Sequence, residues 1–191
     1  MKTDIKFSEN VILIDAEFVD KVVTDLKNHF SKSLNKELPN ADMALFLECI
    51  ALEAGIRTAN NDIQVLFIYD DNMLKSFTPS NLEKELNNVA FKSNLGEFSL
   101  YSYHTSDMTT VRDLYIESLK LVADSADVKR FIAIPDEINY GDKINPILKS
   151  VDGKEDMIVF GMNPICGAPA VRWETMGYAV LKALGIKSDE I

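Results

Sequence analysis

The chain has 191 residues, of which 47% are hydrophobic and 26% are charged. This length and composition suit one globular domain with a sizeable core rather than a disordered or fibrous chain. The formal net charge of −10 argues against a surface that binds duplex DNA, because such proteins neutralise phosphates with a basic face. No apolar stretch approaches the ~18 residues of a membrane span, so we expect no membrane partner.

The sequence also predicts a compartment. The N-terminus, MKTDIKFSEN, has no apolar run of signal-peptide length. The two cysteines and two histidines are widely separated, which is too few for a disulfide framework or a zinc site. We therefore expect a cytoplasmic protein in which Cys49 and Cys166 are buried free thiols.

Apolar patterning predicts strands that alternate with helices along the whole chain. The runs at 11–14 and 63–71 are continuously apolar, as in strands buried on both faces, whereas 97–105 alternates and predicts a more exposed strand. This alternation predicts a three-layer α/β fold, with a mainly parallel five-stranded sheet flanked by helices, in a single domain over 1–191. The expected strands are 11–14, 63–71, 97–105, 130–137 and 156–162, and the expected helices are 19–30, 41–55, 80–89, 111–122, 144–151 and 171–185.

Acidic residues follow several of the predicted strands. In parallel α/β sheets, ligands bind beyond the carboxyl ends of the strands. If the first and fourth strands are neighbours, Asp15 and Asp136 can share a hydrated Mg²⁺ or Mn²⁺, which prefers carboxylate oxygen. Such an ion can polarise a phosphoryl oxygen and activate water. The acids and the one histidine at strand ends are Asp15, Glu17, Asp70, Asp71, His104, Asp107, Asp136 and Glu137.

Each of these acids also has a structural interpretation. An Asp after a strand commonly caps the next helix, so Asp15 is equally consistent with a cap and with a metal ligand. Asp70 and Asp71 lead into a predicted turn, and Asp107 can be a helix cap. The stretch TVRD at 110–113 matches a capping box, and helical phase places Asp113 on the solvent side.

The order of elements and the strand-end residues resemble the NYN domains, which are PIN-like metal-dependent ribonucleases. Their first strand ends in an Asp followed by Glu and Asn, similar to LIDAEF at 13–18. Their fourth strand leads into an Asp-rich loop, a helix containing Pro and a strand ending in Gly, similar to 131–162. The resemblance implies a Rossmann-like, PIN/NYN-type core at 11–162, followed by a C-terminal helical extension at 163–191.

The resemblance also implies a site. It predicts RNA as the substrate, Mg²⁺ or Mn²⁺ as the cofactor, and Asp15 and Asp136 as the catalytic acids. Phe18 stands where the family has Asn, and an insertion separates Asp136 from the second acid of its loop, Asp142. The implied metal ligands are Asp15, Glu17, Asp113, Asp136 and Asp142.

Three alternatives to a ribonuclease remain open. One is a catalytically inactive binding or regulatory domain of the same fold, with a protein partner on the apolar C-terminal segment around Trp173, Met176 and Tyr178. Another is a DEDD-type exonuclease, because IDAEFV resembles its first motif and Tyr103 with Asp107 matches Tyr-x-x-x-Asp. A nucleotide-binding enzyme is the weakest, because no phosphate-binding glycine loop is present.

Overall fold

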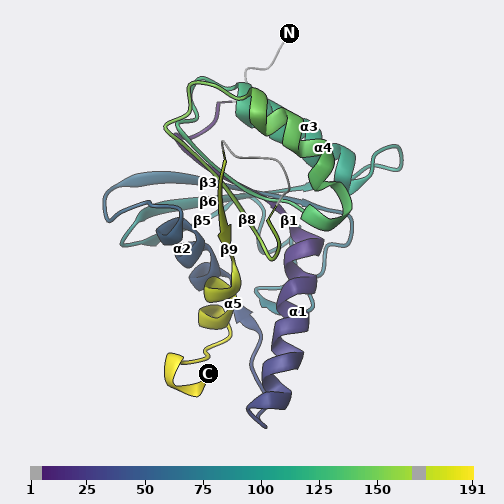
Figure 1. Ribbon diagram of the computed structural model, residues 1–191, viewed down its shortest axis with the longest axis vertical. Helices are drawn as coiled ribbons and strands as arrows, with labels where there is room; N and C mark the ends of the chain where they lie inside the picture. Colours follow the sequence, from purple (N-terminus) through teal and green to yellow (C-terminus); the bar gives the residue numbers. More distant parts are fainter. Residues whose placement is uncertain (1–5, 165–170) are drawn as a thin grey trace.

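A computed structural model describes residues 6–164 and 171–191 as a central sheet between two helical layers (Figure 1). Helices α1, α2 and α5 cover one face of the sheet, and α3 and α4 cover the other. The predicted α/β class is therefore confirmed, although the sheet has seven strands where five were expected. The strands of this sheet are β1 (Asn10–Asp15), β3 (Asn61–Tyr69), β5 (Val89–Ser93), β6 (Gly96–His104), β7 (Arg130–Ile134), β8 (Asp156–Gly161) and β9 (Arg172–Thr175). The helices are α1 (Ala16–Ser33), α2 (Met43–Glu53), α3 (Val111–Asp124), α4 (Glu137–Ser150), α5 (Gly177–Ala183) and the 3₁₀ turn η1 (Ser188–Glu190), and a separate small sheet pairs β2 (Ala41–Asp42) with β4 (Phe77–Thr78).

The order of strands creates a switch point beside β1. The sheet runs β5-β6-β3-β1-β7-β8-β9, and every pairing is parallel except that of β5 with β6. From β1 the chain adds β3 and β6 on one side, and later adds β7, β8 and β9 on the other. Connections that diverge in this way leave a crevice at the carboxyl ends of the two central strands.

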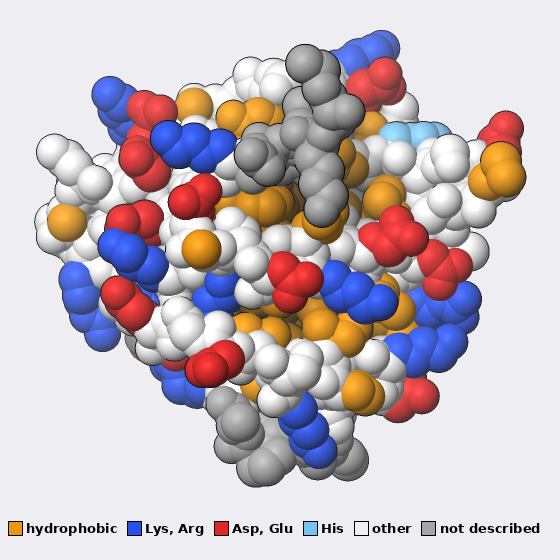
Figure 2. Space-filling model, turned by 90° about the horizontal axis from the view of Figure 1, so that it is seen from above, with side chains coloured by type: hydrophobic (Ala, Val, Ile, Leu, Met, Phe, Trp, Pro, Cys, Tyr) orange, Lys and Arg blue, Asp and Glu red, His pale blue; other side chains and the backbone are white. Residues whose placement is uncertain are grey.

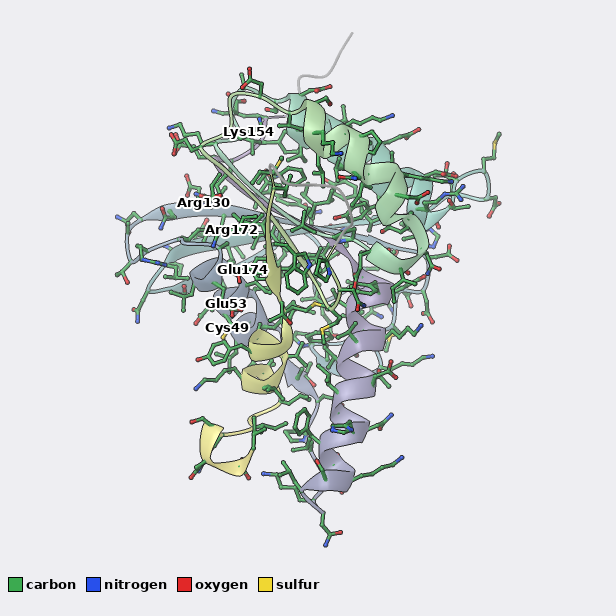
Figure 3. The ribbon with its side chains drawn as sticks, viewed as in Figure 1. Cys49, Glu53, Arg130, Lys154, Arg172 and Glu174 are labelled. Carbon is green, nitrogen blue, oxygen red and sulfur yellow. The ribbon has the colours of Figure 1, made fainter. Side chains whose placement is uncertain are left out.

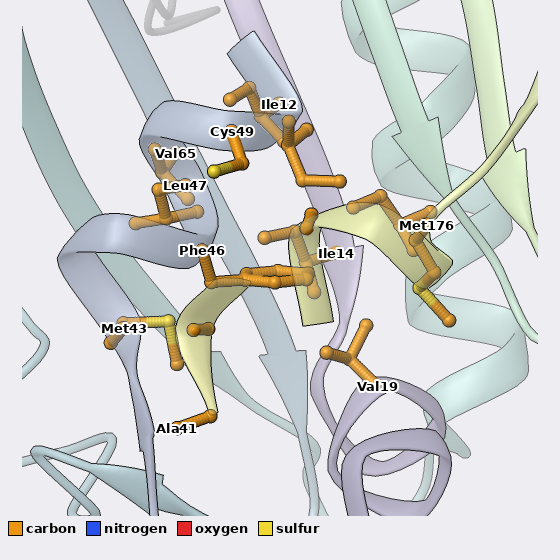
Figure 4. Close-up of a cluster of buried hydrophobic side chains, with 14 of the residues drawn as sticks. Ile12, Ile14, Val19, Ala41, Met43, Phe46, Leu47, Cys49, Val65 and Met176 are labelled. Atoms are coloured by element: carbon orange, nitrogen blue, oxygen red, sulfur yellow. The ribbon is translucent and has the colours of Figure 1, made fainter. Parts of the chain in front are cut away.

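Strand β1 is the centre of the core. All six of its residues are buried, and it pairs with β3 on one side and β7 on the other. Figure 4 shows Ile12 and Ile14 of β1 packed near Phe46 of α2 and Met176. A strand covered on both faces needs apolar residues at every position, which explains the continuous run. Cys49 is buried in this cluster as predicted, whereas Cys166 lies outside the described residues.

Four helices begin at a side-chain cap. Asp15, Asp42, Thr110 and Asp136 each accept a hydrogen bond from the backbone amide three residues further on. Such caps satisfy amides that the first helical turn leaves without partners. The capping interpretation is therefore confirmed for Asp15, for Asp136 and for Thr110 of TVRD, and it is Thr110 rather than Asp107 that caps α3.

The helix predicted at 80–89 is wrong. Residues 82–85 form turns, and β5 begins at Val89. Leu82 and Leu86 are four residues apart, as on a helix face, and both are buried. They reach the core from an irregular segment and not from a helix. The ring of Phe91 then stacks on Phe98 of β6 with centroids 4.7 Å apart. This cross-strand contact, which local periodicity cannot reveal, favours the strand.

The helix predicted at 171–185 is also wrong in its first part, which forms β9. Figure 3 shows Arg172 beside the end of α2. Its guanidinium donates to the carbonyl of Ala54 at 2.9 Å and to that of Glu53 at 3.3 Å, and it pairs with Asp156 at 3.3 Å. Arg172 thus satisfies carbonyls at the end of α2 and ties β9 to the sheet. Within the segment 163–191, β9 and α5 therefore belong to the sheet and its helical layer, and the turn CGAPA at 166–170 lies outside the described residues.

Most of the apolar side chains of residues 171–191 are buried. Met176 and Val180 are fully buried, and Trp173 is partly buried against the α3/α4 side of the core. Tyr178 keeps 53% of its surface exposed. Among the residues that the structure describes, none of the helices combines the length and apolar character needed to cross a bilayer.

Gly96 gives a test of the close approach between β6 and β3. Its φ is +136°, and a Cβ atom there would overlap the backbone of Asn61. Gly96→Ala is therefore expected to lower the free energy of unfolding by more than about 3 kcal/mol in urea denaturation. Gly153→Ala is the matched control, because Gly153 has φ +74° in open space, and about 1 kcal/mol is expected. Equal losses would contradict this assignment.

Candidate functional site

An open cleft of about 970 Å³ occupies the carboxyl edge of the sheet at the switch point. Five acidic side chains line it, together with two basic side chains and one histidine. Its other lining residues are mostly hydroxyl, amide and aromatic side chains. The charged and imidazole groups are Asp15, Glu17, Asp70, Asp107, Asp136, Lys21, Arg112 and His104.

Asp15 lies at the base of this cleft and is only 3% exposed. Its Oδ1 accepts from the amide of Phe18 at 3.0 Å, which caps α1. Its Oδ2 accepts from the hydroxyl of Tyr140 at 2.6 Å. Tyr140 reaches it because its backbone departs from helical geometry, with φ −146° and ψ 18°, near the start of α4. One carboxyl group thus connects α1 and α4 across the crevice.

The surroundings of Asp15 make it easier to protonate. Burial raises the pKa of this carboxyl from 3.8 to about 6, and the nearby Asp136 and Glu17 act in the same direction. The hydrogen bonds from Tyr140 and Phe18 oppose the shift. Burial, followed by the charge of Asp15, raises the pKa of the Tyr140 hydroxyl, so that hydroxyl stays protonated. A carboxyl that titrates near pH 6 can exchange a proton close to neutral pH.

Asp136 also lines the cleft, at the start of α4. Its Oδ1 accepts from the amide of Asn139 at 3.0 Å, and its Oδ2 accepts from the side-chain amide of the same residue. Both oxygens therefore have donors from the first turn of the helix. This arrangement holds the carboxylate at the helix N-terminus, where a negative charge is favourable.

Glu17 holds the loop that follows β3. Its Oε1 accepts from the amides of Asp70 and Asp71, both at 3.2 Å. Glu137 makes the same arrangement after β8, where its Oε1 accepts from the amides of Met162 and Asn163 at 3.0 Å. In each case the first turn of a helix supplies a carboxylate to the exit of the neighbouring strand. These glutamates are therefore loop anchors.

Asp70 and His104 form the wall of the cleft beside β3 and β6. The hydroxyl of Thr105 donates to the carboxylate of Asp70, and a ring nitrogen of His104 lies 3.0 Å from the Asp70 carbonyl. The imidazole also lies edge-on to Tyr69, with centroids 5.2 Å apart. The turn predicted for Asp70 thus also contributes a side chain to the cleft.

The five metal ligands implied by the family resemblance are only partly together. Asp15, Glu17 and Asp136 line the cleft, whereas Asp113 and Asp142 do not. The carboxylate of Asp113 pairs with Arg112 at 2.9 Å, because the helical phase of α3 turns it away. Over 6–164 and 171–191, no group of three or more His, Cys, Asp or Glu side chains is arranged to hold a metal ion. The donor set therefore does not fit a metal centre as placed.

Several cleft residues were not predicted from the sequence, and Tyr140, Arg112 and Lys21 are the three that bear most on its chemistry. Tyr140 is 125 residues from its partner Asp15, and no local pattern signals that contact. Arg112 was overlooked although it lies beside Asp113 in the chain. Lys21 had a usable signal, because it lies one helical turn after Glu17 and so shares a face of α1 with it.

The pKa of Asp15 predicts how stability depends on pH. The carboxyl ionises above about pH 3.8 in the unfolded chain but only above about pH 6 in the folded protein. The free energy of unfolding therefore falls by about 3 kcal/mol from this group as the pH rises through that window. Asp15→Asn keeps a helix cap without the charge. We expect it to melt at a higher temperature than the natural protein at pH 7, with the difference disappearing near pH 4.

Tyr140→Phe is the matched control for this prediction. It removes the hydroxyl that lowers the pKa of Asp15, so the ionised carboxylate loses a partner. We expect a lower free energy of unfolding at pH 7, by about 1–3 kcal/mol. If Asp15→Asn instead melts at a lower temperature than the natural protein at pH 7, the buried charge of Asp15 does not lower the free energy of unfolding.

The loop anchors predict a pattern of hydrogen exchange. Glu17→Gln weakens the acceptor for two amides and should speed exchange at Asp70 and Asp71 while leaving Met162 and Asn163 unchanged. Glu137→Gln should do the reverse. Amide exchange measured by NMR on both variants checks this. Faster exchange at both loops in either variant would indicate general destabilisation instead.

Comparison with known proteins adds a family but no activity. No curated protein and no solved structure matches the chain. One family model matches, over residues 4–191, and it describes a family of unknown function, DUF6621. Because this match spans almost the entire sequence, the chain belongs to the DUF6621 family.

Proposed function

We propose that this chain is a PIN/NYN-like domain that uses the cleft at its switch point to bind a partner and does not hydrolyse RNA. The fold part of the proposal rests on strand order. Numbered along the chain, the six parallel strands follow the order 3-2-1-4-5-6, as in doubly wound, Rossmann-like sheets. In such sheets the crevice beside the first strand is the usual ligand site.

The observation that carries the proposal is the hydrogen bonding of the acids. Asp15 accepts from Phe18 and Tyr140, and both oxygens of Asp136 accept from Asn139. The Oε1 atom of Glu17 accepts from two backbone amides. A metal-dependent nuclease needs carboxylate oxygens that converge on an ion, whereas these carboxylates are directed to helix starts and a loop.

The charge of the molecule supports the same proposal. RNA binding draws much of its affinity from basic side chains that neutralise phosphates. On the face seen in Figure 2, acidic and basic side chains are interspersed and form no basic field. In the cleft, five acids face Lys21 and Arg112. A phosphate chain would be repelled there, whereas a ligand with positive charge would be attracted.

The exonuclease alternative has less support. That class continues its first strand into an antiparallel hairpin. Here helix α1 follows β1 directly, and Asp15 is the residue that caps it. Asp107 lines the cleft, but Tyr103 is not among the lining residues. The Tyr-x-x-x-Asp spacing thus does not bring both residues to Asp15.

Thermal melting with and without Mg²⁺ or Mn²⁺ tests the proposal. We expect neither ion to raise the melting temperature of the natural protein, of Asp15→Asn or of the control Asp142→Asn, whose carboxylate lies outside the cleft. We also expect labelled single-stranded RNA to remain intact with either ion. Metal-dependent stabilisation that Asp15→Asn alone abolishes, together with RNA cleavage, would establish the ribonuclease instead.

A further inference from the structure

Two of the most exposed apolar side chains of the described protein, Met108 and Ile138, belong to two different segments whose neighbouring residues line the cleft. Met108, in the loop between β6 and α3, is 96% exposed, and its neighbours Asp107 and Thr109 line the cleft. Ile138, in the first turn of α4, is 71% exposed, and the next residue, Asn139, also lines the cleft. Apolar side chains presented beside a polar cavity are typical of a surface that a macromolecule covers.

A third exposed apolar side chain, Met73, lies near α1. Together with Met108 and Ile138 it forms what we call the apolar rim of the cleft. Met73 is 45% exposed in the loop after β3. It lines a smaller hollow that shares Glu17 and Lys21 with the cleft. The loop that carries Met73 is held by Asp20, which accepts from the amides of Lys75 and Ser76 at 2.9 Å. The rim is thus presented from a loop that α1 anchors.

The excess of acidic side chains in the cleft favours a partner with positive charge. The cleft is lined by five carboxyl groups and two cationic side chains, in a chain of net charge −10. Within the described part of the chain, the side chain of Asp107 makes no hydrogen bond or ion pair, whereas the amide of Thr109 in the same loop donates to the carbonyl of Ser106. The excess of acids makes the electrostatic potential in the cleft negative. This potential attracts a cationic group and repels an acidic one.

We propose that the cleft docks a segment of another protein, which places a Lys or Arg side chain between the acids and packs apolar side chains against Met108 and Ile138. This inference rests on the proposed function, because it names the partner of the same cleft. A free metal ion or a small polyamine would bind the acids but leave Met108 and Ile138 exposed. A peptide covers the acids and these two side chains together, and the apolar area that it buries on Met108 and Ile138 adds to the affinity.

Fluorescence anisotropy on the full chain tests this with a labelled short peptide of alternating leucine and arginine. Two matched peptides replace arginine by glutamate or leucine by serine. We expect the leucine–arginine peptide to bind at least about tenfold more tightly than either control. Binding by the serine–arginine peptide at equal strength would mean that the acids act alone, and it would overturn the docking proposal.

Variants of the protein locate the binding. The double variant Met108→Ser/Ile138→Ser and the single variant Asp107→Asn should each weaken the leucine–arginine peptide by about tenfold. Their controls are Leu121→Ser, which is 55% exposed on α3, and Asp142→Asn, because neither of these residues nor a chain neighbour of either lines the cleft. All five substitutions are at exposed positions, and circular dichroism checks that each variant folds.

The failures are distinguishable. If the cleft variants and their controls weaken the peptide equally, the attraction is non-specific and the inference fails. If spermine displaces the peptide and binds unchanged to the Met108→Ser/Ile138→Ser variant, the cleft binds a small cation, so the inference fails while the proposed binding function stands. Metal-dependent cleavage of RNA would overturn both.

Discussion

The hydrogen-bonded position of Asp15 is the constraint on which the rest of this structure depends. A buried carboxyl group must find donors, and here one comes from the amide of Phe18 and the other from the hydroxyl of Tyr140. The first bond starts α1 directly after β1, and the second fixes the start of α4 beside it. Because β1 and β7 are neighbours, the two helices diverge from the switch point, and the cleft lies between them.

The same device is used on both sides of the switch point. After β1, Asp15 caps a helix and Glu17 anchors the exit of β3; after β7, Asp136 caps a helix and Glu137 anchors the exit of β8. At the second anchor the sheet must come close, because a Cβ atom on Gly161 would lie 3.0 Å from the Glu137 carboxylate. Acids at strand ends are therefore explained first by helix starts and loop exits, and this explains why a metal-ligand pattern and a capping pattern coincide in the sequence.

How far the sequence predicts the structure depends on the range of the interactions. Strand β1 follows from its continuous apolar run, and helix α3 follows from the helical spacing of its buried residues. Strand β9 does not, because it depends on Arg172 reaching carbonyls of α2 that are 118 and 119 residues away. The cleft shows the same division. Asp15, Glu17 and Asp136 were predicted because they follow strands, whereas Tyr140 was missed because only the tertiary fold brings it to Asp15.

The negative charge of Asp15 is not needed for its role as a helix cap. A helix cap does not require a charge, since Asn caps as well as Asp. Burial raises the pKa of this carboxyl to about 6, so its ionised form at neutral pH costs about 3 kcal/mol. That is a large fraction of the roughly 5–15 kcal/mol by which domains are stable. Sites where a residue opposes stability without serving the fold are where function is expected. The capping bond accounts for the position of Asp15, whereas its negative charge, at the base of an acidic cleft, is the feature that the cationic partner proposed above would bind.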